Sequence, residues 1–166
     1  KITYYEFMRK SNSLAAALAD KGICKGDRVL MLLPDSPQAI MGLHAIWKAG
    51  AVACPCNPCS TESEIENALR YTEAVAVIAA DNMYSTVKKL QPPSCKCIIA
   101  SDQAEYGSAI SRSIYQLFKR KKNGFNATPG QVDDRLQALL RRYKDSGRPW
   151  IELEPTDPAV IVQGSS

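Results

Sequence analysis

The last ten residues of the chain place a small, hydroxyl-bearing loop directly after an apolar segment. Residues 157–166 read Asp-Pro-Ala-Val-Ile-Val-Gln-Gly-Ser-Ser, which predicts a buried strand at 159–162 and a loop at Gly164, Ser165 and Ser166. Backbone N–H groups and hydroxyls in such a turn, at the carboxyl end of a strand, can converge on a phosphate. Short Gly and Ser runs are also ordinary surface turns, so this tripeptide acquires a function only from the sequence before it.

Six cysteines form a second group of residues with chemical potential, at positions 24, 54, 56, 59, 95 and 97. The run Cys56-Asn57-Pro58-Cys59, with Cys95 and Cys97 as a second pair, would suit a metal or redox site. The alternative is a set of free thiols packed in strands, because unpaired cysteine is among the most buried residue types. Since there is one C-x-x-C and no histidine close by, we favour packing and predict no metal ligands.

His44 is the only histidine, and it falls in a predicted helix beside Leu43 and Trp47. A general base needs a nucleophile or an orienting carboxylate, and neither is evident, so we predict a hydrogen-bonded histidine in the core or at its boundary. The chain also has no G-x-S-x-G elbow and no G-x-G-x-x-G after a strand, which disfavours a serine hydrolase and a dinucleotide-binding domain.

Four consecutive cations follow an amphipathic helical pattern, and they are Lys119, Arg120, Lys121 and Lys122. Such a segment can rest on an anionic membrane surface, but cations at the end of a helix are also favoured by the helix dipole alone. We predict at most a weak peripheral membrane contact. The net charge of +4 is spread along the chain and predicts no nucleic-acid partner.

Length and composition are those of one folded domain. The chain has 166 residues, of which 45% are hydrophobic and 23% charged. Its longest apolar runs are strand-sized and fall short of the roughly 20 residues that a membrane-spanning helix needs. The start at Lys1 without Met, and the end inside a loop, predict a fragment of a longer protein.

Strand-sized apolar segments alternate with amphipathic helical segments in the first hundred residues. Capping boxes at Thr3-x-x-Glu6 and Thr61-x-x-Glu64 and the pair Ser36-Pro37 predict three helix starts. The predicted strands are 28–33, 51–56, 75–78, 97–99 and 159–162. Because parallel strands need crossover helices, the alternation predicts an α/β fold, a predominantly parallel sheet of about five strands wound with helices on both faces.

Residues 101–154 differ from this alternation. We predict a two-helix insertion before the last strand, with amphipathic helices at 109–122 and 128–147 that pack on the edge of the sheet or project from it. The predicted organisation is one domain with a β-α core at 1–100, the helical insertion at 101–154, and the last strand with the start of the phosphate loop at 155–166. On the helix that begins at Ser36, we expect Ile40, Leu43 and Trp47 to line the buried side.

Four segments match, in order, the pattern of one known family. Ile2-Thr3-Tyr4-Tyr5-Glu6-Phe7 looks like its opening helix motif, and Gly26-Asp27-Arg28-Val29 with Leu33-Pro34-Asp35-Ser36-Pro37 looks like the following strand and turn. The segment 47–58 is similar to a helix end that passes into a strand finishing in Asn-Pro, and 157–166 resembles the strand before a phosphate-binding loop. Across nearly its whole length the chain thus resembles the amino-terminal part of the adenylate-forming (AMP-binding) acyl-CoA synthetases.

This resemblance implies a two-step reaction. A carboxylate attacks the α-phosphate of ATP to give an acyl-adenylate and pyrophosphate, and the thiol of coenzyme A (CoA) then displaces AMP. Charge builds on phosphoryl oxygens, so donors and Mg²⁺ must be placed around them in advance. In the family this is done by a glycine-, serine- and threonine-rich loop that ends in lysine, of which Gly164, Ser165 and Ser166 match only the beginning. The resemblance implies ATP, Mg²⁺ and CoA as ligands of the intact enzyme, and it predicts no catalytic residue and no turnover within these 166 residues.

Within the family, the basic amphipathic segment and Gln163 are most similar to long-chain fatty-acid–CoA ligases of the bacterial type. A fatty acid substrate and a cytoplasmic enzyme, peripheral at the inner membrane surface, are what this similarity implies. Two alternatives stay open. One is an adenylate-forming enzyme for another carboxylic acid, and the other is a non-catalytic α/β binding module in which residues 101–154 dock a partner.

Overall fold

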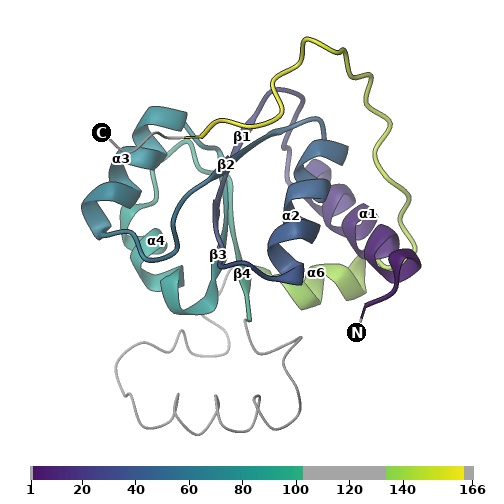
Figure 1. The fold of residues 1–166 in the computed structure, drawn as a ribbon, viewed down its shortest axis with the longest axis horizontal. Helices are drawn as coiled ribbons and strands as arrows, with labels where there is room; N and C mark the ends of the chain where they lie inside the picture. The colour runs from purple at the N-terminus through teal and green to yellow at the C-terminus, as the bar shows by residue number, and fades with distance from the viewer. Residues whose placement is uncertain (1, 103–133, 163–166) are drawn as a thin grey trace, which may run out of the picture.

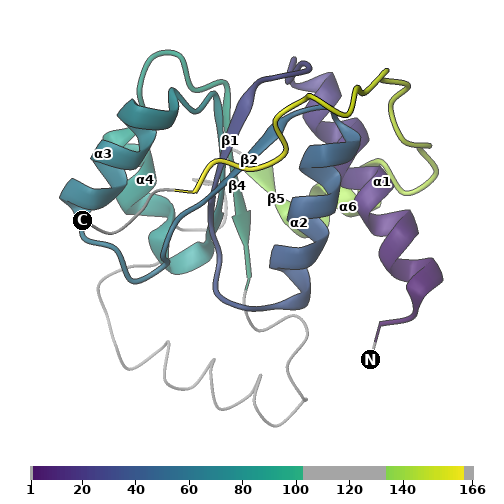
Figure 2. The ribbon, with the colours of Figure 1, turned by 45° about the horizontal axis from the view of Figure 1, so that its top comes forward.

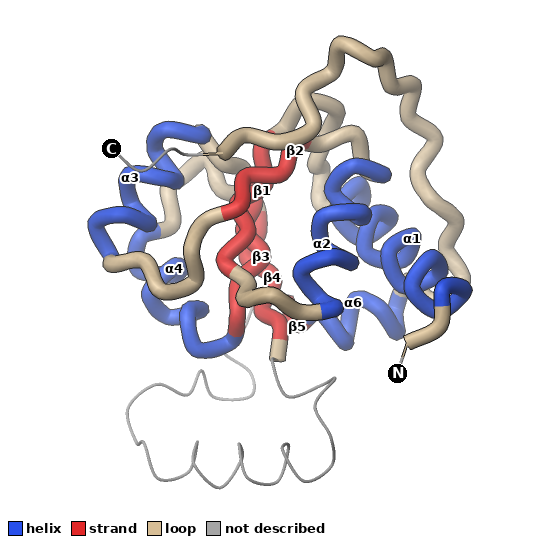
Figure 3. The backbone as a smooth tube through the Cα atoms, viewed as in Figure 1, coloured by secondary structure: helices blue, strands red, loops and turns tan. Residues whose placement is uncertain are grey.

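The structure is a computed structural model that describes residues 2–102 and 134–162. Its elements are α1 (Tyr4–Asp20), β1 (Arg28–Leu32), α2 (Pro37–Lys48), β2 (Val52–Pro55), α3 (Glu62–Thr72), β3 (Ala76–Ala80), η1 (Asp81–Met83), α4 (Tyr84–Leu90), β4 (Cys97–Ser101), β5 (Asp134–Arg135) and α6 (Leu136–Arg142). The sheet runs through the middle of the molecule (Figure 1). Helices α1, α2 and α6 cover one face, and α3 and α4 cover the other (Figure 3). The predicted α/β architecture is confirmed.

The five strands form one sheet in the order β2-β1-β3-β4-β5, and every neighbouring pair is parallel. From β1 the chain moves outward to β2 and then returns past β1 to β3. The winding therefore reverses between β1 and β3. The crossovers from β1 to β2, from β2 to β3 and from β3 to β4 carry α2, α3 and α4, which is the arrangement that the alternation in the sequence predicts for parallel strands.

Capping boxes start α1 and α3, as predicted. Thr3 Oγ1 accepts from the Glu6 backbone N–H at 3.2 Å, and Glu6 Oε2 accepts from the Thr3 N–H at 3.0 Å. The same reciprocal bonds join Thr61 and Glu64. Because each carboxylate accepts hydrogen bonds from its cap residue, the pKa values of Glu6 and Glu64 are held below the ordinary 4.5.

Alternate strand residues supply two apolar cores, one on each face of the sheet. The core under α1, α2 and α6 includes Val29, Met31, Ala76, Ile78 and Ile99. The core under α3 and α4 includes Leu30, Leu32, Val77, Ala79 and Ile98. Full burial of a Val, Leu or Ile side chain stabilises a fold by about 1.5–3 kcal/mol, so this two-sided burial is the main source of stability.

The buried face of α2 differs from the prediction. Met41, Ala45 and Ile46 are buried, whereas Ile40 is 53% exposed. Both sets of residues have helical spacing, so periodicity alone fits either face of this apolar helix.

Helix α6 lies within the predicted insertion at 101–154, but it packs in the core on one face of the sheet instead of on the sheet edge or projecting from it. Its residues Leu136, Leu139 and Leu140 are buried in the core beside α1. An ion pair of 2.6 Å between Lys21 and Asp134 fastens this region to the end of α1. The helix occupies only part of the predicted 128–147, and the predicted helix at 109–122 lies outside the described residues.

The last strand of the sheet is not the one predicted. The fifth strand is β5, in which Asp134 pairs with Ile99, and two charged residues carry no apolar run that would reveal it. The segment at 159–162 makes only a single parallel bridge, Ala53 with Val160. Pro158 precedes this bridge, and a proline has no N–H to extend the pairing.

Candidate functional site

Because all five strands are parallel, their carboxyl ends meet at one edge of the sheet, which we call the carboxyl edge. β1 ends there and leads to Ser36, whose Oγ accepts from the Ala39 N–H at 3.2 Å and caps α2. In open α/β sheets, ligands bind outside the carboxyl ends of the strands, where the winding reverses. The carboxyl edge is therefore the candidate functional site.

Residues 143–162, which we call the return segment, bring the described chain back alongside β2 (Figure 2). The Ala53 N–H donates to the Ala159 carbonyl at 3.0 Å, and the Ile161 N–H donates to the Ala53 carbonyl at 2.9 Å. The bridge is parallel, so the chain runs toward the carboxyl edge as it reaches Val162. The predicted strand thus runs in the direction that a phosphate loop at this edge requires.

The predicted phosphate-loop residues Gly164, Ser165 and Ser166 lie outside the described residues. What the structure supplies is the path of the chain before them.

Two contacts outside β2 also hold the return segment. The side chain of Ile151 lies so close to Gly50 that a Cβ there would come within 2.8 Å of Ile151 Cγ2. Asp157 accepts from the Glu154 N–H at 2.6 Å and pairs with Lys25 at 2.8 Å. The Glu154 backbone bond and then the Lys25 bond hold the pKa of Asp157 below its ordinary 3.8.

Trp47 provides a third contact, which was not foreseen from the sequence. Its Nε1–H donates at 2.9 Å to the Ala159 carbonyl, the same oxygen that Ala53 uses. The Trp47 ring lies 5.4 Å from that of His44, which lies edge-on to Phe7 at 5.1 Å. His44 is half-buried, which confirms its predicted boundary position, but among the described residues its contacts are with these two rings and not the predicted hydrogen bond. One indication of the Trp47 contact was present in the sequence, since the indole N–H of a partly buried tryptophan usually donates a hydrogen bond.

Gln38 is a second polar residue that the sequence analysis missed. It lies in the first turn of α2, is 2% exposed, and donates from Nε2 to the Asp102 carbonyl at 3.2 Å. Its side chain therefore joins the start of α2, which follows β1, to the residue that follows β4. Its Oε1 has no hydrogen-bond partner among the described residues. Glutamine is mostly exposed in proteins, so nothing in the sequence marked it.

The loop after β2 folds back on itself. The Cys56 N–H donates to the Met31 carbonyl at 2.9 Å, and Asn57 Oδ1 accepts from the Cys59 N–H at 2.9 Å. Cys56 Sγ lies 3.7 Å from Ser60 Oγ. Within residues 2–102 and 134–162, no group of three or more His, Cys, Asp or Glu side chains is arranged to hold a metal ion.

Three of the six cysteines are buried, in agreement with the packing prediction. These are Cys54, Cys95 and Cys97. Burial raises the pKa of Cys54 and of Cys97 to about 11, so these thiols stay protonated near neutral pH. Cys24 and Cys59 are exposed.

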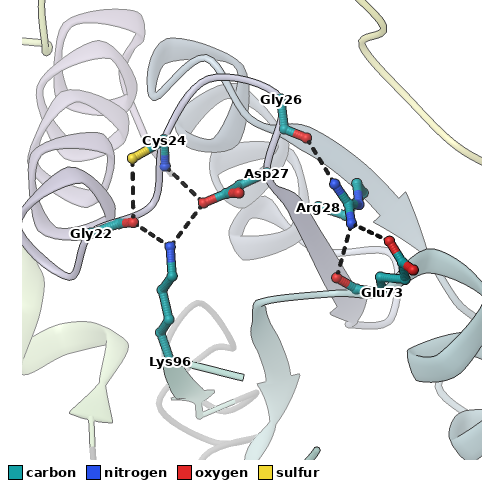
Figure 4. Close-up of polar contacts among 7 residues, drawn as sticks. All are labelled: Gly22, Cys24, Gly26, Asp27, Arg28, Glu73 and Lys96. Carbon is teal, nitrogen blue, oxygen red and sulfur yellow. Dashed lines mark hydrogen bonds and ion pairs between the residues drawn. The ribbon is translucent and has the colours of Figure 1, made fainter. Parts of the chain in front are cut away.

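At the opposite end of the strands, the amino edge, Lys96 joins two connections (Figure 4). Its Nζ donates to the Gly22 carbonyl at 2.5 Å and pairs with Asp27 Oδ2 at 3.1 Å. The same carboxylate oxygen accepts from the Cys24 N–H at 3.0 Å. Lys96 thus holds the turn between α1 and β1 against the start of β4.

Arg28 performs a similar role at the end of α3 (Figure 4). Its Nε donates to the Thr72 carbonyl at 2.8 Å, and its Nη2 pairs with Glu73 Oε2 at 2.8 Å. Glu73 has a left-handed backbone, with φ of +49°. The guanidinium therefore provides a donor for the Thr72 carbonyl, which the helix itself leaves without one.

No helix in the described part of the chain is long and apolar enough to cross a membrane. The basic run Lys119, Arg120, Lys121 and Lys122 lies outside those residues.

Comparison with known proteins identifies the family to which the chain belongs. Residues 1–162 match the family model "AMP-binding enzyme". A long-chain-fatty-acid–CoA ligase from Bacillus subtilis is 28% identical over 123 residues, which cover 74% of this chain and 22% of that protein. The p-hydroxybenzoic acid–AMP ligase FadD22 from Mycobacterium marinum is 29% identical over 190 residues, covering 96% of this chain and 27% of that protein.

Among solved structures, the long-chain-fatty-acid-CoA ligase FadD1 from Archaeoglobus fulgidus has the same fold over 97% of this chain and 27% of its own, with a TM-score of 0.71 at 20% identity. The chain spans about a quarter of the length of these relatives. With a family model that matches almost every residue, and with the parallel sheet and carboxyl edge described above, this chain belongs to the AMP-binding enzyme family.

Proposed function

We propose that this chain is the amino-terminal part of an ATP-dependent ligase that converts a long-chain fatty acid to its CoA thioester through an acyl-adenylate. The observation that carries the proposal is the parallel placement of 159–161 beside β2, which directs the chain toward the carboxyl edge just before Gly164. In this proposal Gly164, Ser165 and Ser166 begin the loop that binds the phosphates of ATP. Their N–H groups and hydroxyls are suitable donors for phosphoryl oxygens.

In this proposal the described residues hold the entry to this loop, and no catalytic role is assigned to any of them. They contain no group of three or more potential metal ligands, so the proposal assigns no ligand of Mg²⁺ within them. When bound, Mg²⁺ would neutralise charge that develops on the phosphates. We also propose that the isolated 166 residues are inactive, because they match only the first residues of the phosphate loop that the family resemblance implies.

The fatty acid is proposed because of the Bacillus subtilis relative and the basic amphipathic segment at 109–122. A second candidate substrate class, aromatic carboxylic acids, is favoured by one observation. The Mycobacterium marinum p-hydroxybenzoic acid–AMP ligase aligns with 96% of this chain at 29% identity.

The test is carboxylate-dependent exchange of radioactive pyrophosphate into ATP by the protein expressed from its complete reading frame. Hexadecanoate, octanoate, acetate and p-hydroxybenzoate are compared, and thioester formation is followed after CoA is added. We expect the highest kcat/KM with hexadecanoate. A preference for p-hydroxybenzoate would mean that the substrate is an aromatic carboxylic acid and not a fatty acid. No exchange with any acid would favour the non-catalytic binding module.

We also propose that the enzyme is cytoplasmic and makes a weak peripheral contact with the inner membrane surface through Lys119, Arg120, Lys121 and Lys122. Co-sedimentation with vesicles that contain anionic lipid is expected to fall when these four residues are replaced by Gln. Equal sedimentation of the two proteins would rule the contact out.

A further inference from the structure

The Ala159 carbonyl is the point at which three elements of the fold meet. It accepts the Ala53 N–H of β2 at 3.0 Å and the Trp47 Nε1–H of α2 at 2.9 Å. A carbonyl oxygen has two lone pairs, so both donors can be accommodated with good geometry. The position of the return segment at this point is therefore set by a strand and a helix together.

The Trp47 ring is itself held in place. It is half-buried, contacts the His44 ring at 5.4 Å, and through His44 is connected to Phe7 of α1. An aromatic side chain in such a cluster has little rotamer freedom left to lose, so its N–H is an oriented donor. In contrast, Trp150 is 93% exposed and makes no hydrogen bond among the described residues.

The contribution of one donor is large here because the pairing with β2 is so short. Two backbone hydrogen bonds, from the Ala53 and Ile161 N–H groups, make the whole bridge. A strand in a full ladder would keep its place after the loss of one side-chain bond. The bridge would keep two of three local hydrogen bonds, and its opening would become easier.

We propose that Trp47 is a positioning residue for the ATP phosphate loop. It acts through the Ala159 carbonyl, by fixing the bridged segment 159–162 that precedes Gly164 in the sequence, and it touches neither ATP nor the reacting atoms. This inference rests on the proposed function, because it assigns a role to Trp47 in ATP binding by the same site.

The test uses the protein expressed from its complete reading frame, with Trp47→Phe as the main variant and Trp150→Phe as the matched control. Replacement of Trp47 by benzothienylalanine, which keeps the bicyclic shape and lacks the N–H, separates the hydrogen bond from packing. Two quantities are measured: the exchange rate of the Ile161 amide hydrogen without substrates, and the steady-state KM for ATP and for the carboxylic acid.

We expect both Trp47 variants to exchange the Ile161 amide about fivefold faster and to raise the KM for ATP by about fivefold, the factor that corresponds to one net hydrogen bond. The KM for the acid should stay unchanged. General destabilisation would instead lower kcat without a selective change for ATP. Trp150→Phe should match the wild type in every measurement.

Unchanged exchange in the benzothienylalanine protein would overturn the inference, since the hydrogen bond would then not hold the segment. Faster exchange with an unchanged KM for ATP would also overturn it, while leaving the proposed ligase function intact. A wild-type protein that turns over no ATP with any acid would overturn the proposed function and, with it, the role of Trp47.

Discussion

The two edges of the sheet are held by different kinds of contact. At the amino edge, the side chains of Lys96 and Arg28 bind backbone carbonyls at the ends of α1 and α3. At the carboxyl edge, the loop after β2 makes an internal hydrogen bond from Cys59 to Asn57, and the return segment joins β2 through one bridge. The difference indicates that charged side chains join the connections at the amino edge, whereas the neutral Gln38 side chain joins two of them at the carboxyl edge, where ligands bind in open α/β sheets.

The largest expected effect on stability comes from a substitution at Gly50, where the amino edge contacts the return segment. Gly50 has φ of +73°, and a Cβ there would lie 2.8 Å from Ile151 Cγ2 and 3.3 Å from Lys25 Cα. We expect Gly50→Ala to lower the free energy of unfolding by about 2–4 kcal/mol, since left-handed strain adds to the displacement of Ile151. Urea denaturation measures this change.

Gly22→Ala is the control for the strain alone. Gly22 has φ of +77°, and a Cβ there meets nothing within 4 Å. The expected loss is about 1–2 kcal/mol. Equal losses for the two variants would show that Ile151 is not packed against Gly50 in solution.

The cysteines offer a comparison of a buried position at the start of β4 with an exposed position in the loop after β2. Cys97 at the amino edge is buried, with its pKa raised to about 11 from an ordinary 9.0, whereas Cys59 at the carboxyl edge is exposed. At pH 8, a thiol with a pKa of about 11 holds about a hundredfold less thiolate than one with the ordinary pKa of 9.0. Burial also slows access of the reagent to the sulfur. Iodoacetamide at pH 8, followed by peptide mass spectrometry, should label Cys59 at least a hundredfold faster than Cys97. Similar rates would mean that the start of β4 opens readily.

Removal of the Arg28 cap should weaken the amino edge measurably. Arg28→Met leaves the Thr72 carbonyl and the end of α3 without their donor. Since this side chain is 30% exposed, we expect a loss of about 1–2 kcal/mol in urea denaturation rather than the full value for a charged hydrogen bond.

Lys89→Met is the matched control, because Lys89 pairs with Glu62 at a site where the two side chains are 67% and 56% exposed. The expected loss is below about 0.5 kcal/mol. If both variants lost the same amount, Arg28 would contribute no more than an ordinary surface ion pair.

The smallest expected effect is a dependence of stability on pH. The fold lowers the pKa of Glu64 from 4.5, so its contribution is fully present above 4.5 and is lost as the pH falls through the folded-state pKa. Wild-type stability should therefore decline below pH 4.5, and Glu64→Gln should show a shallower decline. Glu66→Gln, an exposed change on the same helix, should keep the wild-type slope in urea titrations from pH 7 to pH 3.

Most of the fold was predictable because local signals agreed with one another. The capping boxes of Thr3 and Thr61 and the apolar runs of β1, β3 and β4 appear where the sequence placed them. β5 could not be predicted, since its two residues pair with β4 through backbone bonds that need no apolar pattern. The prediction of the buried face of α2 was wrong at Ile40, because in an apolar helix two different faces fit the same helical periodicity.

The candidate site was predictable only in part. The direction of the segment before Gly164 followed from the strand and loop pattern, and the structure describes that segment beside β2. The roles of Trp47 and Gln38 depend on partners far away in the sequence, Ala159 and Asp102. Such contacts leave no local pattern, so only the tertiary arrangement reveals them.

The contact between Trp47 and Ala159 joins residues 112 positions apart. Closing so long a loop costs chain entropy that local contacts do not repay, so such pairs form late. During refolding, β1 to β4 and their helices should assemble first and the return segment should dock last. The segment that docks last should also detach first. In limited proteolysis we therefore expect the first cleavages among the described residues to fall between α6 and Ala159.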